Sequence, residues 1–377
     1  MANIERALAS IRRISDIQPI EGADKIEVAT VDGWKVVVNK DKFKVNDLVI
    51  YIEVDSFVPT KVAPFLSKGK EPREFNGIKG ERLKTIRLRG QISQGLILPI
   101  TNDIEMENYY SQLECGTVRA NFVELDEGVD VTSLLQIQKY EAPTTPHLSG
   151  SAKGNFPVDI PRTDQTRIQN LKCAFDKEVT PYQYEVTEKI HGTSATFYLS
   201  PEGEFIVCSR NINLKEEEGN LYWEMAKKLD IERKLREQIE GFGVTGFGLA
   251  IQGEIVGPGI NGNQYELTST KFYVFDIIAV DRNDNDSWYL SPEDRLHTVG
   301  ALKLNHVPVL SMSASIYEAY DYALETLLTY SEGTSAINNS KREGVVFKRI
   351  GTVGVKTAMQ DVVSFKVVSN DWLLENE

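Results

Sequence analysis

Short apolar runs fill the first hundred positions of the chain and predict strands. Residues 26–31 and 34–38 are rich in Val, Ile and Ala, and Asp32-Gly33 between them suits the positive φ angles of a two-residue hairpin turn. Further strands are predicted over residues 48–54 and 83–89. Because these strands are short and little helical periodicity separates them, we expect a small all-β barrel.

The second half of the chain mixes helical and strand patterns. Residues 221–239 place apolar residues four positions apart, with Lys, Arg and Glu on the other faces, which predicts helical structure. Ser291-Pro292-Glu293-Asp294 combines a capping hydroxyl, an early Pro and an acid three residues on, which predicts a helix start. Strands are predicted at 184–187, 195–199, 272–277 and 364–369, and the stretch 341–348 contains three apolar strand residues, 345–347.

Between the two halves, residues 140–162 are rich in Pro, Thr, Ser and Gly without clear periodicity, which is typical of a linker or extended arm. A short helix is expected over residues 164–171. We therefore predict a barrel module over residues 1–125, a linker or extended arm over 126–162, and a mixed α and β domain over 163–377.

The composition is that of an ordinary globular protein, with a formal net charge of −13. Binding to nucleic acid would therefore need a local basic surface. Such a surface is predicted near residues 82–89, where Lys84, Arg87 and Arg89 precede amide and hydroxyl side chains. A barrel edge that charges protect from aggregation would show the same pattern.

The chain shows no sign of a membrane, disulfide or zinc protein. No apolar run is long enough to span a membrane, and charged residues interrupt the first 17 positions, so we expect a cytoplasmic protein without a signal peptide. The three cysteines and four histidines are widely spaced and form no Cys-x-x-Cys motif.

The strongest candidate for chemistry is Glu188-Lys189-Ile190-His191-Gly192-Thr193, which joins two predicted strands through a tight turn. Lys189, at a strand end, becomes a nucleophile only if burial or neighbouring cations favour its neutral form. Gly192 would let the backbone approach a bound group closely. For this motif alone, a surface hairpin with a solubilising Lys is the ordinary alternative.

Later strands also carry charged residues among apolar neighbours. Arg210 ends one apolar run, and Glu254 precedes a Gly-Pro-Gly loop. Glu343 and Lys348 frame three apolar residues and Lys366 lies inside another strand, positions that cost stability if the charges are buried unpaired. Each alone has a simpler interpretation as a turn or charged strand end, but together they would suit a nucleoside triphosphate and its metal.

In order and spacing, these motifs resemble those of covalent ligases and capping enzymes, and His191 in place of the commoner Asp is similar to RNA ligases in particular. The whole chain resembles the Deinococcus-type RNA ligase family. That resemblance implies an α+β chain in which an N-terminal OB-like β-barrel precedes a mixed α/β, ATP-grasp-like nucleotidyltransferase domain with antiparallel sheets.

The resemblance implies an ATP-dependent RNA ligase of RNA repair. Lys189 would attack the ATP α-phosphate and hold AMP, the AMP would pass to an RNA 5′-phosphate, and an RNA 3′-hydroxyl would displace it. The implied cofactors are ATP and Mg²⁺ or Mn²⁺. The implied partner is nicked or broken RNA with 3′-hydroxyl and 5′-phosphate ends, and we expect a monomer without a membrane partner.

The family's other roles carry over by position. Glu188 and Phe275 would contact adenine, with Phe272 the alternative because the two rings face opposite ways. Glu343 and Glu254 would hold a hydrated metal. The remaining residues implied at the nucleotide are His191, Gly192, Arg210, Lys348 and Lys366, and those implied at RNA are Lys84, Arg87 and Arg89.

Two positions depart from the family pattern and leave other interpretations open. Ser194 stands where related RNA ligases often carry Asn, and Ser364 where many carry a further Lys. The alternatives are a DNA ligase or GTP-using capping-type enzyme, and a non-catalytic RNA-binding protein with a decayed ligase domain. The lack of a C-terminal OB domain after Lys366 disfavours the first, and the filled charged positions disfavour the second.

Overall fold

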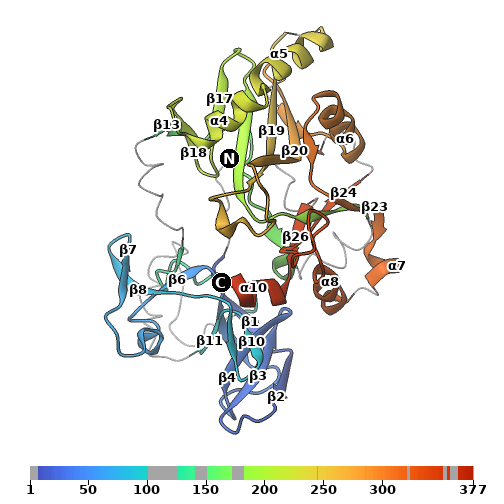
Figure 1. The fold of residues 1–377 in the computed structure, drawn as a ribbon. Coiled ribbons are helices and arrows are strands. Elements are labelled where there is room, and N and C mark those ends of the chain that lie inside the picture. Colours follow the sequence, from blue (N-terminus) through green and yellow to red (C-terminus); the bar gives the residue numbers. More distant parts are fainter. Residues whose placement is uncertain are drawn as a thin grey trace. The chain divides into compact units, whose positions relative to one another are not determined.

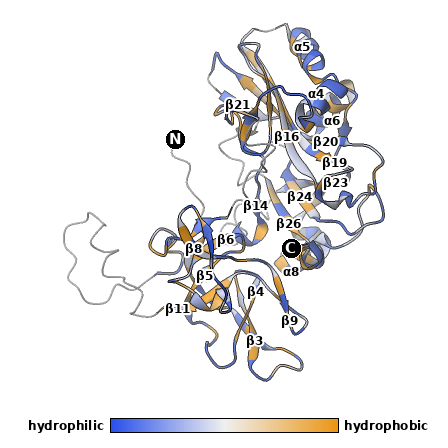
Figure 2. Cartoon of the chain, turned by 60° about the vertical axis from the view of Figure 1, so that its left-hand side comes forward, coloured by the Kyte–Doolittle hydropathy of each residue, from blue (hydrophilic) through white to orange (hydrophobic). Residues whose placement is uncertain are grey.

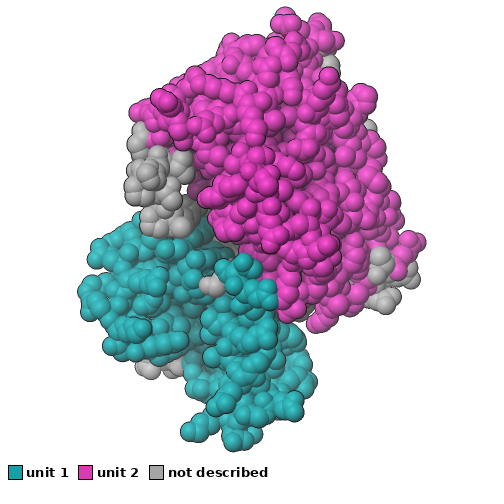
Figure 3. Space-filling view, viewed as in Figure 1, with its two compact units in different colours: residues 1–143, 373–377 teal, residues 144–372 magenta. Residues whose placement is uncertain are grey.

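The computed structural model describes residues 7–100, 126–140, 151–171, 182–243, 245–284, 286–320, 323–350, 355–356 and 364–376. The chain divides into two compact units, Met1–Pro143 with Leu373–Glu377, and Thr144–Trp372 (Figure 3). Short strands dominate the first unit, whereas the second combines longer strands with helices (Figure 1).

The first unit has the strand-rich organisation that the apolar pattern predicts. Its elements are β1 (Ala9–Arg13), β2 (Asp16–Pro19), β3 (Ile26–Val31), β4 (Trp34–Asn39), β5 (Leu48–Ile52), β6 (Ser56–Pro59), the 3₁₀ helix η1 (Pro64–Ser67), β7 (Arg73–Phe75), β8 (Ile78–Arg82), β9 (Ile86–Leu88), β10 (Gln91–Ser93), β11 (Leu96–Pro99) and β12 (Gln138–Lys139). They form sheets with the orders β2-β3-β4, β1-β5-β11, β12-β6-β8-β7 and β9-β10.

Strand β5 is central to the first unit because both of its faces are buried. Ile50 and Ile52 belong to one apolar cluster, whereas Val49 and Tyr51 pack with Trp34 in another. The hairpin that joins β3 to β4 is confirmed, with φ angles of 49° at Asp32 and 82° at Gly33.

The strand predicted over residues 83–89 is shorter than expected. Strand β8 ends at Arg82, and the next strand, β9, begins at Ile86 and pairs with β10. Leu83 and Thr85 are buried between the two strands. Burial still alternates over residues 83–86, but residues 83–85 lie outside the named strands and Ile86 to Arg89 are all exposed, so the basic positions fall on and beside a separate two-stranded ribbon.

Two sheets form the framework of the second unit. The larger contains β13 (Ala152–Asn155), β16 (Thr193–Leu199), β17 (Phe205–Cys208), β18 (Ile212–Leu214), β19 (Phe247–Val256), β20 (Lys271–Asp281), β21 (Asp286–Tyr289), β22 (Asn305–His306) and β25 (Val355–Lys356). Its order is β13-β18-β17-β16-β19-β20-β21-β25, with β22 parallel to β20 and the other pairs antiparallel.

The smaller sheet contains β14 (Thr166–Arg167), β15 (Gln183–Lys189), β23 (Val309–Ser315), β24 (Gly344–Arg349) and β26 (Ser364–Val368). Its order is β14-β26-β24-β15-β23, and only β14 and β26 are parallel. The antiparallel sheets predicted for this half of the chain are therefore confirmed.

Helices cover the two sheets, and their outer faces are polar, as α5 shows (Figure 2). They are η2 (Ile168–Leu171), α4 (Leu221–Lys228), α5 (Ile231–Phe242), η4 (Asn261–Asn263), α6 (Pro292–Ala301), α7 (Ile316–Tyr320), α8 (Leu324–Ser331) and α10 (Asn370–Asn376). The region predicted over 221–239 is two helices, because Asp230 adopts a φ angle of 54° between them. Ser291 caps α6 as predicted, accepting a hydrogen bond from the Asp294 amide.

The described part of the predicted linker contributes to both units. Residues 138–139 form β12 in the first unit, whereas β13 joins the larger sheet of the second. Phe156 and Ile160 are buried against that sheet. The short helix expected over 164–171 is instead strand β14 followed by η2, since pairing with β26 holds its first half extended. The predicted boundaries at 125 and 162 stay predictions.

Candidate active site

The Lys189 motif crosses from one sheet to the other. Strand β15 ends at Lys189 and pairs with β23 and β24, whereas β16 begins at Thr193 and pairs with β17 and β19. The expected strand, turn and strand are present, but the two strands are not partners, so the motif is no hairpin. A Cβ atom at Gly192 would lie 2.3 Å from the Ile255 carbonyl oxygen, so only glycine fits this crossing.

Lys189 faces a carboxylate from the neighbouring strand. Its Nζ lies 2.5 Å from Glu343 Oε1, and β15 pairs Lys189 with Gly344, the residue after Glu343. The Lys189 side chain is 25% exposed and the Glu343 side chain 10%, so the pair is reachable from solvent but largely enclosed. His191 Nδ1 is 3.8 Å from Glu343 Oε2, and within the described residues that oxygen has no hydrogen-bond partner.

Glu254 reaches the same place from the larger sheet. Its Oε1 accepts a hydrogen bond from the Gly192 amide at 3.0 Å. Burial raises the pKa of Glu254 to about 8; Lys189 opposes the rise and Glu343 adds to it. Two carboxylates that repel each other in this way favour the approach of a cation.

Lys366 adds positive charge from β26. Burial and, after it, the charge of Lys189 lower the pKa of Lys366 to about 7; Arg167 and Arg210 act in the same direction, and Asp164 opposes them. Arg167 lies beside Lys366 in the β14–β26 pair. The sequence pointed to Lys366 but not to Arg167, which falls in the segment 164–171 where a short helix was expected and is recognised only through that pairing.

The segment 163–165 contacts Arg210 and both positions that depart from the family pattern. Asp164 accepts hydrogen bonds from Arg210 at 2.6 Å to each carboxylate oxygen. Thr163 Oγ1 lies 2.6 Å from Ser194 Oγ, and Gln165 Nε2 donates to Ser364 Oγ at 2.9 Å. The two serines therefore anchor this segment beside the predicted phosphate residues.

Lys348 is bonded to two residues of β20. Its Nζ bonds to Asp276 Oδ1 at 2.7 Å and to the Phe275 carbonyl oxygen, and lies 5.7 Å from the centre of the Phe275 ring. Burial lowers the pKa of Lys348, whereas Asp276 opposes that change. A bulge in β20 opposite Gln252 and Gly253 places Phe275 and Asp276 together at Lys348.

The two candidate aromatic residues occupy different environments. Phe272 is fully buried in the core of the larger sheet, with its ring centre 5.0 Å from that of Phe197. Phe275 is only partly buried and borders a small apolar cluster that includes Tyr265 and Ile337. Only Phe275 is therefore accessible to a bound ring.

Glu188 is a buried carboxylate with an unused acceptor. Its Oε2 accepts a hydrogen bond from the Ala336 amide at 2.8 Å, whereas Oε1 has no partner within the described residues. Burial raises the pKa of Glu188, and hydrogen bonds from Ser335 and Ala336 oppose that rise. Such an acceptor suits a ligand N–H group.

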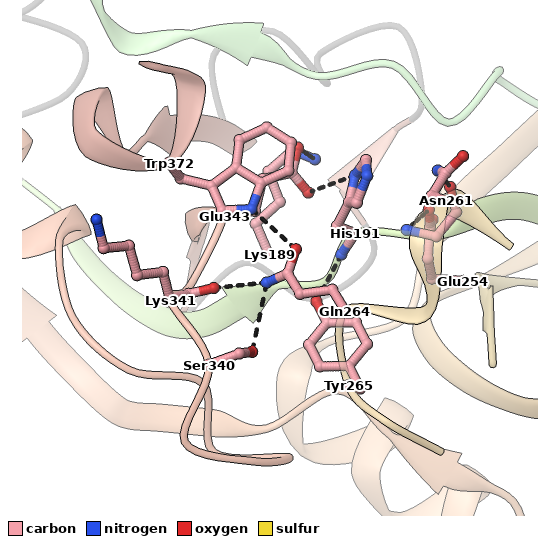
Figure 4. Close-up of polar contacts among 11 residues, drawn as sticks. Lys189, His191, Glu254, Asn261, Gln264, Tyr265, Ser340, Lys341, Glu343 and Trp372 are labelled. Carbon is pink, nitrogen blue, oxygen red and sulfur yellow. Dashed lines mark hydrogen bonds and ion pairs between the residues drawn. The ribbon is translucent and has the colours of Figure 1, made fainter. Parts of the chain in front are cut away.

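Three residues that the sequence did not single out surround His191 (Figure 4). Tyr265 accepts a hydrogen bond from the His191 amide at 2.7 Å. The Trp372 ring lies edge to face with His191, at 4.6 Å between centres, and its Nε1 donates to Gln264 at 2.9 Å. No pattern in the sequence links these positions to the motif.

The basic residues predicted for RNA lie in the first unit. Lys84, Arg87 and Arg89 are exposed, on or next to the β9–β10 ribbon. Arg82 is instead paired with Asp55 and stacks over the Tyr140 ring at 5.0 Å.

Two further observations concern metals and membranes. Among the residues with described positions, no group of three or more His, Cys, Asp and Glu side chains is arranged to hold a metal ion directly. In the same part of the chain, no helix combines the length and apolar character that a membrane crossing requires.

Comparison with known proteins identifies relatives of both parts of the chain. An OB-fold domain model matches residues 8–100, and an RNA ligase model matches residues 183–368. A search of curated proteins found no match.

The chain is similar over almost its whole length to a solved RNA ligase of Naegleria gruberi. A variant of that enzyme with AMP and Mn has 35% identity and a TM-score of 0.77, with 98% of each chain covered. The same ligase with PPi gives 35% identity and a TM-score of 0.76, with 98% of each chain covered. A variant with ATP and Mn gives 35% identity and a TM-score of 0.76, covering 97% of this chain and 98% of the other.

The resemblance inferred from the motifs is thus confirmed over both modules, and the chain belongs to the RNA ligase family, with an OB-fold domain preceding the ligase domain.

Proposed function

We propose that this protein is an ATP-dependent RNA ligase that joins RNA 3′-hydroxyl and 5′-phosphate ends through a lysyl-AMP intermediate. The observation that carries the proposal is the arrangement at Lys189, where one amine meets two carboxylates and Lys366 at the junction of two sheets. Enclosed charges of this kind cost stability unless a charged ligand or a reaction uses them.

Lys189 is the nucleophile. Its pairing with Glu343 at 2.5 Å fixes the direction of Nζ before a nucleotide arrives. After Nζ loses its proton, it forms a P–N bond with the α-phosphorus of ATP, and pyrophosphate leaves. The AMP then moves to an RNA 5′-phosphate, and the 3′-hydroxyl of the other end displaces it.

The adenine site lies between Glu188 and Phe275. Glu188 Oε1, which has no hydrogen-bond partner among the residues with described positions, accepts a hydrogen bond from the exocyclic amine, and the accessible ring of Phe275 stacks on the base. Guanine would present a carbonyl oxygen to Glu188 instead, so a carboxylate acceptor here favours ATP over GTP.

Positive side chains neutralise the phosphates. Lys366 and Arg210 face them directly, and Gly192 with His191 lines the α-phosphate. Lys348, which is bonded to Asp276 and lies beside the Phe275 ring, adds to the positive electrostatic potential at the phosphates. The segment 163–165 orients this group through Arg210 and Ser364.

A divalent cation fits beside Glu343 and Glu254. Within the described residues Glu343 Oε2 has no hydrogen-bond partner, and burial raises the pKa of Glu254, so a cation beside the two carboxylates would stabilise their charged forms. Such a cation would keep several of its waters. Mg²⁺ or Mn²⁺ in that position would supply charge neutralisation at the phosphates.

The RNA partner is nicked or broken RNA, bound in part by Lys84, Arg87 and Arg89. The proposal includes the module boundaries 1–125, 126–162 and 163–377, a monomeric state and a cytoplasmic location. The exposed strand β9 and the matched OB-fold region support the assignment of RNA binding to the first module.

The test uses labelled ATP or GTP, with Mg²⁺, and detection of a protein adduct that is stable to base and labile to acid. The wild-type protein should label with ATP, and Lys189→Ala should not, while both keep the same circular dichroism spectrum. Lys153→Ala, which removes an exposed Lys of the same unit, serves as the matched control. Normal labelling of Lys189→Ala would remove the assignment of the nucleophile, and preference for GTP would favour a capping-type enzyme.

A further inference from the structure

The terminal helix α10 brings an indole against the motif histidine (Figure 4). Trp372 is 5% exposed, and its ring meets that of His191 at an interplanar angle of 65°. In this edge-to-face geometry, two aromatic rings fix each other's orientation. The RNA ligase model ends at residue 368, so this contact lies outside the region that defines the family match.

Gln264 fixes the indole. Its side-chain oxygen accepts from Trp372 Nε1 at 2.9 Å, and its side-chain nitrogen donates to the Lys341 carbonyl oxygen at 2.5 Å. Its own carbonyl oxygen accepts from Asn338. One amide therefore connects the indole with the loop that leads into Glu343.

Glu332 secures the start of α10. Its carboxylate accepts hydrogen bonds from Ser369 Oγ at 2.6 Å and from the Asn370 amide at 2.9 Å. Ser369 Oγ in turn accepts from the Trp372 amide at 3.0 Å. A carboxylate at a helix N-terminus is stabilising, so the first turn that carries Trp372 is rigidly placed.

We propose that Trp372, oriented by Gln264, is a positioning residue for His191 in lysine adenylylation. His191 is then held at two points, through its amide by Tyr265 and through its ring by Trp372. With both points fixed, the imidazole stays beside Glu343 and Lys189. This inference rests on the proposed function, because it assigns a role within the same site.

The two contacts restrict different movements. The bond to Tyr265 fixes the backbone but leaves the side chain free to rotate about two torsions. The indole occupies the volume into which the imidazole would turn. Removal of the indole therefore releases the ring without breaking any bond of Lys189, and the reacting groups lose their alignment.

The experiment measures the single-turnover rate of protein–AMP formation without RNA, together with the KM for ATP. Trp372→Ala is expected to lower the rate about 10- to 100-fold while the KM for ATP changes less than about threefold, because adenine contacts are untouched. Trp372→Phe, which keeps a ring against His191, should stay within about threefold of wild type. Gln264→Ala should cause a smaller loss than Trp372→Ala, and a still smaller one in the Trp372→Phe background, where its bond to the indole is already absent and its bond to the Lys341 carbonyl oxygen is left to lose.

A double-variant experiment tests whether Trp372 acts through His191. His191→Asp replaces the ring with the residue that is commoner at this place in the motif, so the variant should retain measurable labelling. Adding Trp372→Ala to His191→Asp should then cost less than about twofold. The control Trp223→Ala truncates a partly buried indole of the same unit, which donates to the Leu214 carbonyl oxygen, and should leave the labelling rate unchanged.

Two outcomes would overturn the inference: a full loss from Trp372→Ala in the His191→Asp background, or a loss from Trp223→Ala as large as that from Trp372→Ala. Either would mean that the indole acts on the fold in general. If Trp372→Ala does not fold, a Trp372→Phe rate as low as that of Lys189→Ala would also overturn it. Failure of the proposed function is distinguishable, because then the wild-type protein itself forms no adduct.

Discussion

Replacement of Lys366 by Met should make the protein more stable and inactive. The pKa of Lys366 falls from 10.5 to about 7, chiefly because its charged form is buried and secondly because Lys189 repels it. At about 1.4 kcal/mol for each pH unit, this fall sets an upper limit of about 5 kcal/mol on the cost of the charge. Because Lys366 keeps partial contact with solvent, we expect Lys366→Met to gain about 2 kcal/mol.

The gain should depend on pH with a defined sign. The folded-state pKa of Lys366 lies below its value in the unfolded chain, so between about pH 7 and 10.5 the unfolded chain binds more protons. Wild-type stability therefore rises with pH across that window. The advantage of Lys366→Met should be complete below pH 7 and should shrink as the pH rises towards 9.

Urea unfolding of wild type and Lys366→Met at pH 6.5, 7.5, 8.5 and 9 measures this effect, and adduct labelling measures the loss of function, expected to exceed about 100-fold. Lys271→Met is the matched control, because Lys271 also lies on a strand of the second unit but is exposed. The reasoning would be refuted if Lys366→Met were less stable than wild type at every pH, or if its gain in free energy of unfolding did not change with pH. Either result would mean that the buried charge of Lys366 does not destabilise the empty site.

Two other predictions concern the substrates. Glu188→Ala should raise the KM for ATP about 10- to 100-fold in the labelling assay, with a smaller effect on the rate at saturating ATP. The reason is that a hydrogen bond to a charged acceptor contributes about 1.5–3 kcal/mol. An unchanged KM would contradict the adenine contact. The double variant Arg87→Ala with Arg89→Ala should weaken binding to nicked RNA and lower the slope of log K against log salt by about two, with adduct formation unchanged; an unaltered slope would place RNA elsewhere.

Features set by neighbouring residues were predictable from the sequence. The turn at Asp32-Gly33 and the cap at Ser291 depend on local backbone chemistry, and both are present as expected. The mixed α and β class also follows from periodicity. The break between α4 and α5 was not predicted, because Asp230 adopts its positive φ for reasons that the apolar spacing does not reveal.

Features set by the choice of strand partners were not predictable. The motif strands β15 and β16 look like a hairpin in sequence, yet they do not pair with each other: β15 pairs with the distant β23 and β24, and β16 pairs with the distant β19 as well as with the nearby β17. The same holds for Arg167, which lies beside Lys366 only because β14 joins the edge of the smaller sheet. Likewise, the bulge in β20 that brings Asp276 and Phe275 to Lys348 has no local signal.

This division explains why the motif positions are recognisable in sequence while their supports are not. Lys189 and Lys366 lie in the smaller sheet and Glu343 directly before its strand β24, whereas Glu254 lies in the larger sheet. The chain crosses between the two sheets at Gly192, whose amide donates to Glu254. A reactive group must have one particular chemical type, so the residue types of the motif can be recognised in the sequence. A support needs only to fill a volume or satisfy a bond, and many residue types at many positions can do that. The search for further functional residues should therefore begin from contacts with the motif, as Trp372 illustrates.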